Sequence, residues 1–318
     1  MTRNVVPIVS LLCLVLFSVF SCLPIHAVEQ CPSGVERIHA DCVWDNDHNM
    51  IVEQSDRERA GYPVSVAVID KGFWFDEYPN NGTIKHHDDL SENIIGAYNF
   101  RYNQGIVEIV PLSLLFLNPN EEEQNHGTHC TGIIGAVDNE IGVIGTAPKV
   151  GIYLLQLNRA LNSELKAAIE WCSDYAVQIV SISLYNFTYD SDVEKACVEA
   201  YEKGTLIFAC VGNEGRLRDD NRMYPFGYDD VIGVGAVDPS DNWAPFSNYG
   251  WYVDFVAPGW DIYSTIRNNG YGNMTGTPQA CAHVAATAAL IKGSEEEAEY
   301  GNVWNTTTII RKLRDTAL

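Results

Sequence analysis

Positive charge is scarce in this chain of 318 residues, in which 20 Lys and Arg stand against 42 Asp and Glu, for a formal net charge of −22 at pH 7. This balance disfavours nucleic acids and anionic membrane surfaces as partners, because both repel an acidic surface. Charged residues make up only 19% of the chain and hydrophobic residues 46%, an ordinary globular composition. Repeats and low-complexity linkers are absent, which predicts one domain, or one domain with a small appendage.

Long apolar runs are also absent beyond the N-terminus. Residues 5–22 form an apolar stretch after Arg3, and Ile25-His26-Ala27 offers a cleavage site. We therefore predict a signal peptide at residues 1–27, a mature domain at 28–318, and a secreted, extracellular protein. The alternative is an uncleaved anchor, since the stretch is close to the ~18 residues of a spanning helix. Only in that case would the protein contact a membrane.

The cysteines do not form an even set. Of the nine in the sequence, Cys13 and Cys22 fall in the signal segment, so at least one of the others stays unpaired. Two pairings are considered, Cys31 with Cys42 and Cys172 with Cys197. Spacing alone does not establish either of them.

Apolar runs alternate with helical patterns along the rest of the chain. The pattern predicts strands at 64–69, 150–157, 177–184, 205–211 and 231–237, and helices at 126–136, 161–172, 193–203 and 278–291. The last helix is apolar nearly all round and must be buried. We therefore predict an α/β fold with a mostly parallel central sheet and helices on both faces. Residues 106–120, with the acidic run 121–123 after them, are predicted to form an inserted surface loop.

Four blocks of residues carry more specific information. They are the strand 66–69 that ends in Asp70-Lys71-Gly72, and the segments 126–132 (HGTHCTG), 211–215 (VGNEG) and 276–285 (GTPQACAHVA). In this order the set resembles the subtilisin-like serine protease family (peptidase S8) over residues 34–316. The resemblance implies the three-layer α/β fold of that family. It covers the chain from Gly34 onward, so no inhibitory pro-domain fits between the signal and the domain, and the C-terminus stops short of the family's usual end.

The resemblance also implies roles for four residues. His126 is the general base, Asp70 is the carboxylate that orients it, and Asn213 donates its side-chain amide to the oxyanion. Pro278 stands where the family has its nucleophilic Ser. Proline has neither a hydroxyl nor a backbone N–H, so the attacking group and a second oxyanion donor are lost together.

We therefore expect a pseudoprotease, a monomer that acts by binding a protein or peptide. The alternative is an active serine-type endopeptidase with an unrecognised nucleophile, and a relic without function is a third hypothesis. Three side chains are considered as substitute nucleophiles: Thr277, Cys130 and Cys281. Tyr185 and Asn186 replace two glycines that line the pocket for the residue before the cleaved bond, and we expect them to crowd it.

A structural Ca²⁺ ion is a further implication of the resemblance. The loop 137–143 is similar to the family's calcium loop, in which side-chain and backbone oxygens hold the ion. The implied ligands in this chain are Asp89, Val137, Asn139, Ile141 and Val143. An ordinary surface loop is the alternative, because the ligand from the N-terminal segment cannot be placed.

Overall fold

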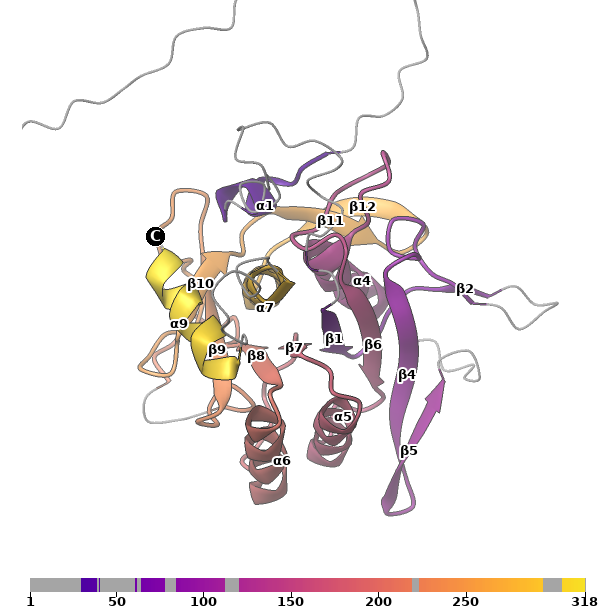
Figure 1. Cartoon of the computed structure of the whole chain (residues 1–318), viewed down its shortest axis with the longest axis vertical. Coiled ribbons are helices and arrows are strands. Elements are labelled where there is room, and N and C mark those ends of the chain that lie inside the picture. Colours follow the sequence, from indigo (N-terminus) through magenta and orange to yellow (C-terminus); the bar gives the residue numbers. More distant parts are fainter. Residues whose placement is uncertain are drawn as a thin grey trace, which may run out of the picture.

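The computed structural model describes residues 30–38, 40, 61, 64–77, 84–111, 120–218, 223–293 and 305–317. At their centre is an eight-stranded sheet in the order β10-β9-β8-β7-β1-β6-β4-β5 (Figure 1). Its strands are β1 (Ser65–Asp70), β4 (Ile94–Asn103), β5 (Ile106–Pro111), β6 (Gly151–Leu157), β7 (Ile179–Ile182), β8 (Leu206–Cys210), β9 (Val231–Val237) and β10 (Phe255–Pro258). Neighbouring strands pair in parallel except β4 and β5, which are antiparallel. The predicted mostly parallel α/β sheet is confirmed.

Helices cover both faces of this sheet (Figure 1). One face packs against α4 (Glu121–Gly135) and α7 (Thr277–Gly293), together with α1 (Ser33–Arg37) and α9 (Thr306–Thr316). The other face packs against α5 (Asn162–Asp174) and α6 (Ser191–Glu202). Alternate residues of β1 divide between the two cores, with Val66 and Val68 on the α4 side and Ala67 and Ile69 on the α5 side. A strand buried on both faces needs apolar residues throughout, which explains its sequence.

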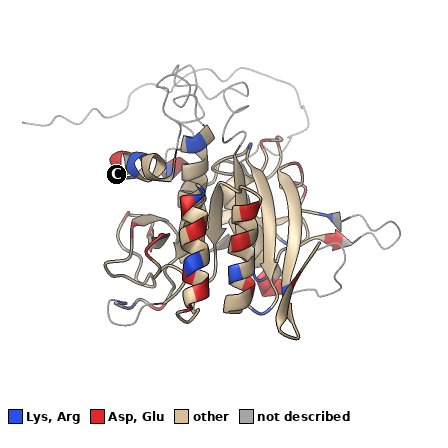
Figure 2. Ribbon diagram, turned by 60° about the horizontal axis from the view of Figure 1, so that its bottom comes forward, with Lys and Arg blue, Asp and Glu red and all other residues tan. Residues whose placement is uncertain are grey.

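The helices differ in how much charge they carry. Among the Asp, Glu and Lys residues of α5 and α6 only Glu164 is buried, and Figure 2 marks the positions of these residues along the two helices. By contrast, α7 is buried along nearly its whole length, as its all-apolar sequence predicts. The acidic surface therefore lies partly on the helices that are farthest from α7 in the layered structure.

The start of α4 differs from the prediction. The helix begins at Glu121, because Asn120 and Glu123 form a capping box: the Asn120 side chain accepts from the Glu123 N–H at 2.9 Å. Three glutamates in the first turn also suit the positive end of the helix dipole. The acidic run 121–123 is thus the first turn of a helix, and the prediction of a loop there was wrong.

Residues 106–111 also differ from the predicted loop, because they form β5, the edge strand of the sheet. Gln104 and Gly105, with φ of 46° and 96°, make the tight turn that joins it to β4. Two short antiparallel pairs complete the described strands: β2 (Asp76–Glu77) with β3 (Ile84–Lys85), and β11 (Ile262–Ile266) with β12 (Gly270–Met274).

Some predictions fall on parts of the chain outside the described residues, namely the signal segment 1–27 and Cys42 of the considered Cys31–Cys42 pair. No helix within the described ranges combines the length and apolar character needed to span a bilayer. The considered Cys172–Cys197 disulfide is not formed: both are free, fully buried thiols in the α5–α6 core. There they pack as small apolar side chains.

Candidate active site

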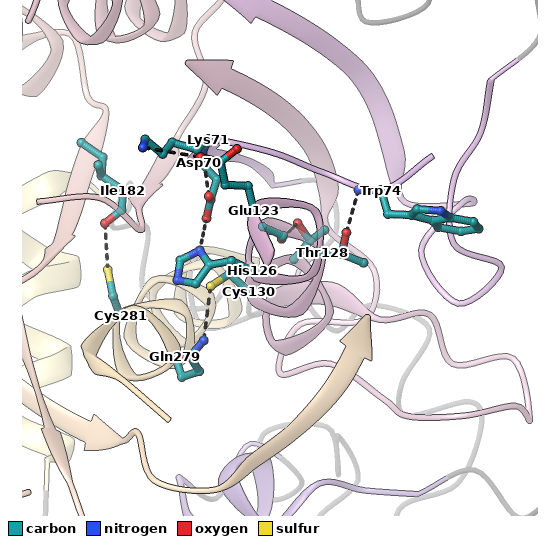
Figure 3. Close-up of polar contacts among 12 residues, drawn as sticks. Asp70, Lys71, Trp74, Glu123, His126, Thr128, Cys130, Ile182, Gln279 and Cys281 are labelled. Carbon is teal, nitrogen blue, oxygen red and sulfur yellow. Dashed lines mark hydrogen bonds and ion pairs between the residues drawn. The ribbon is translucent and has the colours of Figure 1, made fainter. Parts of the chain in front are cut away.

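The predicted acid–base pair is brought together at the carboxyl end of β1. Asp70 is the last residue of β1 and is 1% exposed, and His126 lies in the second turn of α4. His126 Nδ1 and Asp70 Oδ2 are 2.7 Å apart (Figure 3). The second oxygen, Oδ1, accepts from the Lys71 N–H at 2.6 Å, so the carboxylate is held at both ends.

This pairing sets the properties of the imidazole. Burial lowers the pKa of His126, whereas the charge and hydrogen bond of Asp70 raise it, and the net result is a raised pKa. A carboxylate at Nδ1 favours the proton on that nitrogen, which leaves Nε2 as the basic atom. The pair therefore has the arrangement that a general base requires.

The Asp70–His126 contact depends on the close approach of α4 to the loop after β1. Gly127 follows His126, and a Cβ at this position would lie 2.1 Å from the Gly72 carbonyl oxygen and 2.9 Å from the Phe73 ring. The Trp74 N–H donates to Thr128 Oγ1 at 2.9 Å and ties the same loop to the helix (Figure 3). Only glycine at position 127 permits this contact.

Asn213 lies beyond the end of β8 and faces the start of α7. Its Oδ1 accepts from the Thr277 N–H at 2.8 Å and from Thr277 Oγ1 at 3.0 Å. With Oδ1 fixed, Nδ2 lies toward Gly276 and Pro278: both Nδ2 and Pro278 Cδ are 3.1 Å from the position of a Cβ on Gly276. The Asn213 amide thus lies at the start of α7, of which Pro278 is the buried second residue.

The three considered substitute nucleophiles have different surroundings. Thr277 Oγ1 is engaged with Asn213 Oδ1 and the Gly212 N–H. Cys281 is buried and its sulfur faces the sheet, 3.8 Å from Ser181 Oγ and 4.0 Å from the Ile182 carbonyl oxygen (Figure 3). Cys130 alone of the three lies with the acid–base pair, its sulfur within 4.8 Å of ligand atoms of Asp70 and His126.

Two residues near Cys130 were not predicted from the sequence. The Gln279 side-chain amide donates to the Cys130 sulfur at 3.9 Å, and the buried Ser183 hydroxyl lies next to that thiol. Ser183 directly follows β7, the parallel neighbour of β1, so its position at the carboxyl end of a strand was the available signal. Gln279 had no comparable signal, because its contact joins two helices far apart in the sequence.

Tyr185 covers the backbone next to Asn213. Its ring carbon Cδ2 is 3.0 Å from the position of a Cβ on Gly212, and its hydroxyl interacts with the Glu214 carboxylate. Burial, followed by the charge of Glu214, raises the pKa of Tyr185 to about 12. Asn248 and Arg218 donate to Glu214 Oε2 at 2.6 and 2.7 Å, so the partner of the Tyr185 hydroxyl is itself held in place.

The neighbouring Asn186 has a φ of 76°, a conformation that normally favours glycine. Position 186 therefore has a backbone conformation that suits glycine, although it carries an asparagine side chain. Tyr185 and Asn186 thus place two side chains in the loop that follows β7.

The candidate calcium loop offers a buried oxygen donor. Asp89 is 0% exposed; its Oδ2 accepts from the Val143 N–H at 2.9 Å, while its Oδ1 has no hydrogen-bond partner among the described residues. Burial raises the pKa of Asp89 to about 6 despite the Val143 hydrogen bond. A buried carboxylate oxygen without a partner fits a hard cation, which would stabilise the ionised form.

The rest of the loop is arranged around that carboxylate. The Val137 N–H donates to the Asp89 carbonyl oxygen at 2.8 Å, and Asn139 Oδ1 accepts from the Ile141 N–H at 3.1 Å. Gln30 pairs with Val143 and fixes the N-terminal segment against the loop. The oxygens of Asp89 and Asn139 and the carbonyls of Val137, Ile141 and Val143 would hold the ion.

An Asp–His pair lies at the carboxyl end of β1 and a side-chain amide lies beyond the end of β8, in a mostly parallel α/β sheet covered by helices on both faces. The chain belongs to the subtilase family (peptidase S8), whose sequence model matches residues 61–317. It is 37% identical to subtilisin DY of Bacillus licheniformis over 265 residues, 82% of this chain and 84% of that one.

Two further relatives extend the comparison. Subtilisin BL of Lederbergia lenta is 32% identical over 291 residues, which cover 90% of this chain and 91% of the relative. The major intracellular serine protease of Bacillus subtilis is 31% identical over 277 residues, 85% of this chain and 77% of the relative. The family relationship therefore spans the candidate site.

Proposed function

We propose that this subtilase homologue is a catalytically silent protein that acts by binding a protein or peptide. The single observation that carries the proposal is Pro278, at the position of the family's nucleophilic Ser. The flanking Gly276-Thr277 and Ala280 match the family pattern without a gap, which supports this register. In subtilisin, the worked case for such losses, removal of the nucleophile alone costs about 10⁶ in turnover.

Proline suits the fold at this position. The N–H groups of the first helical turn have no partner within the helix, and proline is preferred there. Loss of the N–H therefore costs α7 little, whereas an oxyanion next to Asn213 Nδ2 would lack its second donor. The substitution removes catalytic groups and leaves the scaffold intact.

The environment of Tyr185 supports the same conclusion. Its ring covers Gly212 and its hydroxyl interacts with Glu214, in the segment that matches the family's pocket for the residue before the cleaved bond. The connection from β6 to α5 is also short, residues 158–161, and is fixed by Glu164, which accepts from the Arg159 and Leu161 N–H groups at 2.8 and 3.3 Å. A bound peptide would therefore contact a surface that differs from an open protease cleft.

A fluorophosphonate probe tests the proposal, because it labels an activated serine. The unmodified protein, Pro278→Ser, Pro278→Ala and the double variant Pro278→Ser/His126→Ala are compared. We expect labelling of Pro278→Ser alone. Labelling of the unmodified protein would refute catalytic silence.

An active endopeptidase remains the second candidate, favoured by the Cys130 sulfur within 4.8 Å of the acid–base pair. Burial raises the pKa of this thiol well above its usual value, which opposes a nucleophilic thiolate. Hydrolysis of a fluorogenic peptide by the unmodified protein, lost in Cys130→Ser and retained in Cys281→Ser, would establish this candidate.

We also propose a secreted monomer with a structural Ca²⁺ ion. The signal-like residues 1–27 support export, although one relative is named an intracellular protease. Expression with the native N-terminus, followed by mass determination of the protein in the medium, checks cleavage near Ala27. Light scattering of the same material checks the monomer: a dimer mass would refute it.

A further inference from the structure

Three side chains of different chemistry converge beside α4. A carboxylate oxygen of Asp70, a ring nitrogen of His126 and the sulfur of Cys130 all lie within 4.8 Å of one another. His126 and Cys130 are four residues apart and share one face of the helix. Figure 3 shows the Cys130 sulfur next to the His126 ring, with the Gln279 amide on its other side.

This donor set is one that Zn²⁺ prefers. Zn²⁺ binds thiolate, imidazole and carboxylate ligands at about 2.0–2.3 Å, in tetrahedral geometry that places ligand atoms roughly 3.3–3.8 Å apart. The observed separations bracket this range: the Asp70–His126 contact, at 2.7 Å, would have to open slightly, and the other separations, at most 4.8 Å, would have to close by about 1 Å. We propose that Asp70, His126 and Cys130 form a Zn²⁺ site whose fourth position is open to solvent or to a small ligand.

Charge balance supports a divalent cation here. Asp70 and Cys130 are buried, at 1% and 0% exposure, while the His126 side chain is 26% exposed and gives access from solvent. One carboxylate, one thiolate and a neutral imidazole around Zn²⁺ leave no net buried charge, which avoids the large cost of an isolated buried ion.

The surroundings already hold the ligands in orientation. The Lys71 N–H fixes Asp70 Oδ1 at 2.6 Å, so Oδ2, which contacts His126 Nδ1 at 2.7 Å, is the oxygen that would bind the metal once that contact opens. The Gln279 amide donates toward the Cys130 sulfur at 3.9 Å, a contact that would strengthen with a thiolate. A thiol must lose its proton to bind Zn²⁺, so metal binding at Cys130 should release a proton.

The inference does not depend on catalytic silence. Bound Zn²⁺ would occupy the imidazole that acts as a base, so it would also block any residual peptidase activity. The readout is therefore metal binding, and its failure would leave the proposal about Pro278 untouched.

The test uses the full mature chain, reduced and saturated with Ca²⁺, so that the loop 137–143 is occupied. Co²⁺ serves as the spectroscopic probe and Zn²⁺ as its competitor. We expect the visible bands of tetrahedral Co²⁺ and a near-ultraviolet thiolate-to-metal band, both abolished by one equivalent of Zn²⁺. Calorimetry in two buffers of different ionisation enthalpy should show release of at least one proton per Zn²⁺, that of the Cys130 thiol.

Variants identify the ligands. Cys130→Ser should lose the thiolate band, and the matched control Cys281→Ser, a buried cysteine whose sulfur faces the sheet, should keep it. Asp70→Asn and His126→Gln, with folding checked by circular dichroism, should weaken Zn²⁺ binding roughly tenfold or more. The proposal is overturned by a Zn²⁺ Kd weaker than about 10 μM, by a thiolate band that survives in Cys130→Ser, or by unchanged affinity in both folded ligand variants.

Discussion

Substitution of Gly127 by alanine tests the contact on which the Asp70–His126 geometry depends. In an open helix, alanine is favoured over glycine by about 1 kcal/mol. Here the added Cβ would lie 2.1 Å from the Gly72 carbonyl oxygen, well short of the roughly 3.5 Å of a normal contact. The obstacle is backbone rather than a flexible side chain, so α4 or the loop after β1 must move by more than about 1 Å.

We expect the clash to outweigh the helical preference. Overpacking of this kind costs about 1–3 kcal/mol and occasionally more, and the rigid backbone places Gly127→Ala at the upper end, about 3 kcal/mol. Urea unfolding followed by tryptophan fluorescence measures the change as a lower midpoint at constant slope.

Gly272→Ala is the control, because a Cβ at this position meets its nearest neighbour, an Ile266 side-chain carbon, at an ordinary 3.4 Å. Its effect should stay below about 1 kcal/mol. Equal or increased stability of Gly127→Ala would show that the helix does not approach the loop this closely, and the geometry inferred for the acid–base pair would be wrong.

Three further predictions concern charged groups. Glu164→Gln should lower the free energy of unfolding by about 1.5–3 kcal/mol, because Glu164 is fully buried and accepts from three backbone N–H groups. The control Glu170→Gln, at an exposed side chain, should change the free energy of unfolding by less than about 0.5 kcal/mol. Urea unfolding of both variants measures the difference. Asp70→Asn should lower the pKa of His126, read from its imidazole NMR signals. Because the pKa of His126 is raised in the folded protein, the Asp70–His126 pair stabilises the fold below pH about 6.5, and this stabilisation is lost as pH rises through the folded pKa. An unchanged pKa in Asp70→Asn would contradict the assignment of Asp70 as the partner of His126. Removal of Ca²⁺ with a chelator should lower the Tm. The loss corresponds to about 2.7 kcal/mol if the free ion was present at about a hundred times its Kd. In Asp89→Asn the chelator should no longer change the Tm.

The sequence predicted those parts of the fold whose residues carry a local pattern. Strands β1, β6, β8 and β9 were found because burial on both faces demands continuous apolar runs. The β4–β5 hairpin was missed because it is half-exposed, Ile106 and Ile109 are apolar residues in exposed positions, and the alternation of β5 is weak. The start of α4 was misplaced because three successive glutamates were taken as loop residues, although Asn120 and Glu123 are the stronger local signal.

The candidate site shows the same division. Asp70, His126 and Asn213 stand in short motifs and could be named from them, and the structure brings Asp70 to His126. The role of Gln279 depends on a contact between helices far apart in the sequence, which no local pattern encodes, whereas Ser183 could have been found from its place after a parallel strand. The considered Cys172–Cys197 pairing failed for a related reason, because residence in one core does not establish the geometry of a bond.

The edge strand β5 affects the tendency of this protein to self-associate. An unpaired strand at the end of a sheet is a template on which a second chain can add itself. Strand β5 carries Glu108, which forms an ion pair with Arg101 across the hairpin. It ends at Pro111, which has no N–H to donate to an added strand. Strand β5 is therefore poorly suited to self-association. Replacement of Glu108 and Pro111 by apolar residues that have a backbone N–H should make the protein aggregate in concentrated solution.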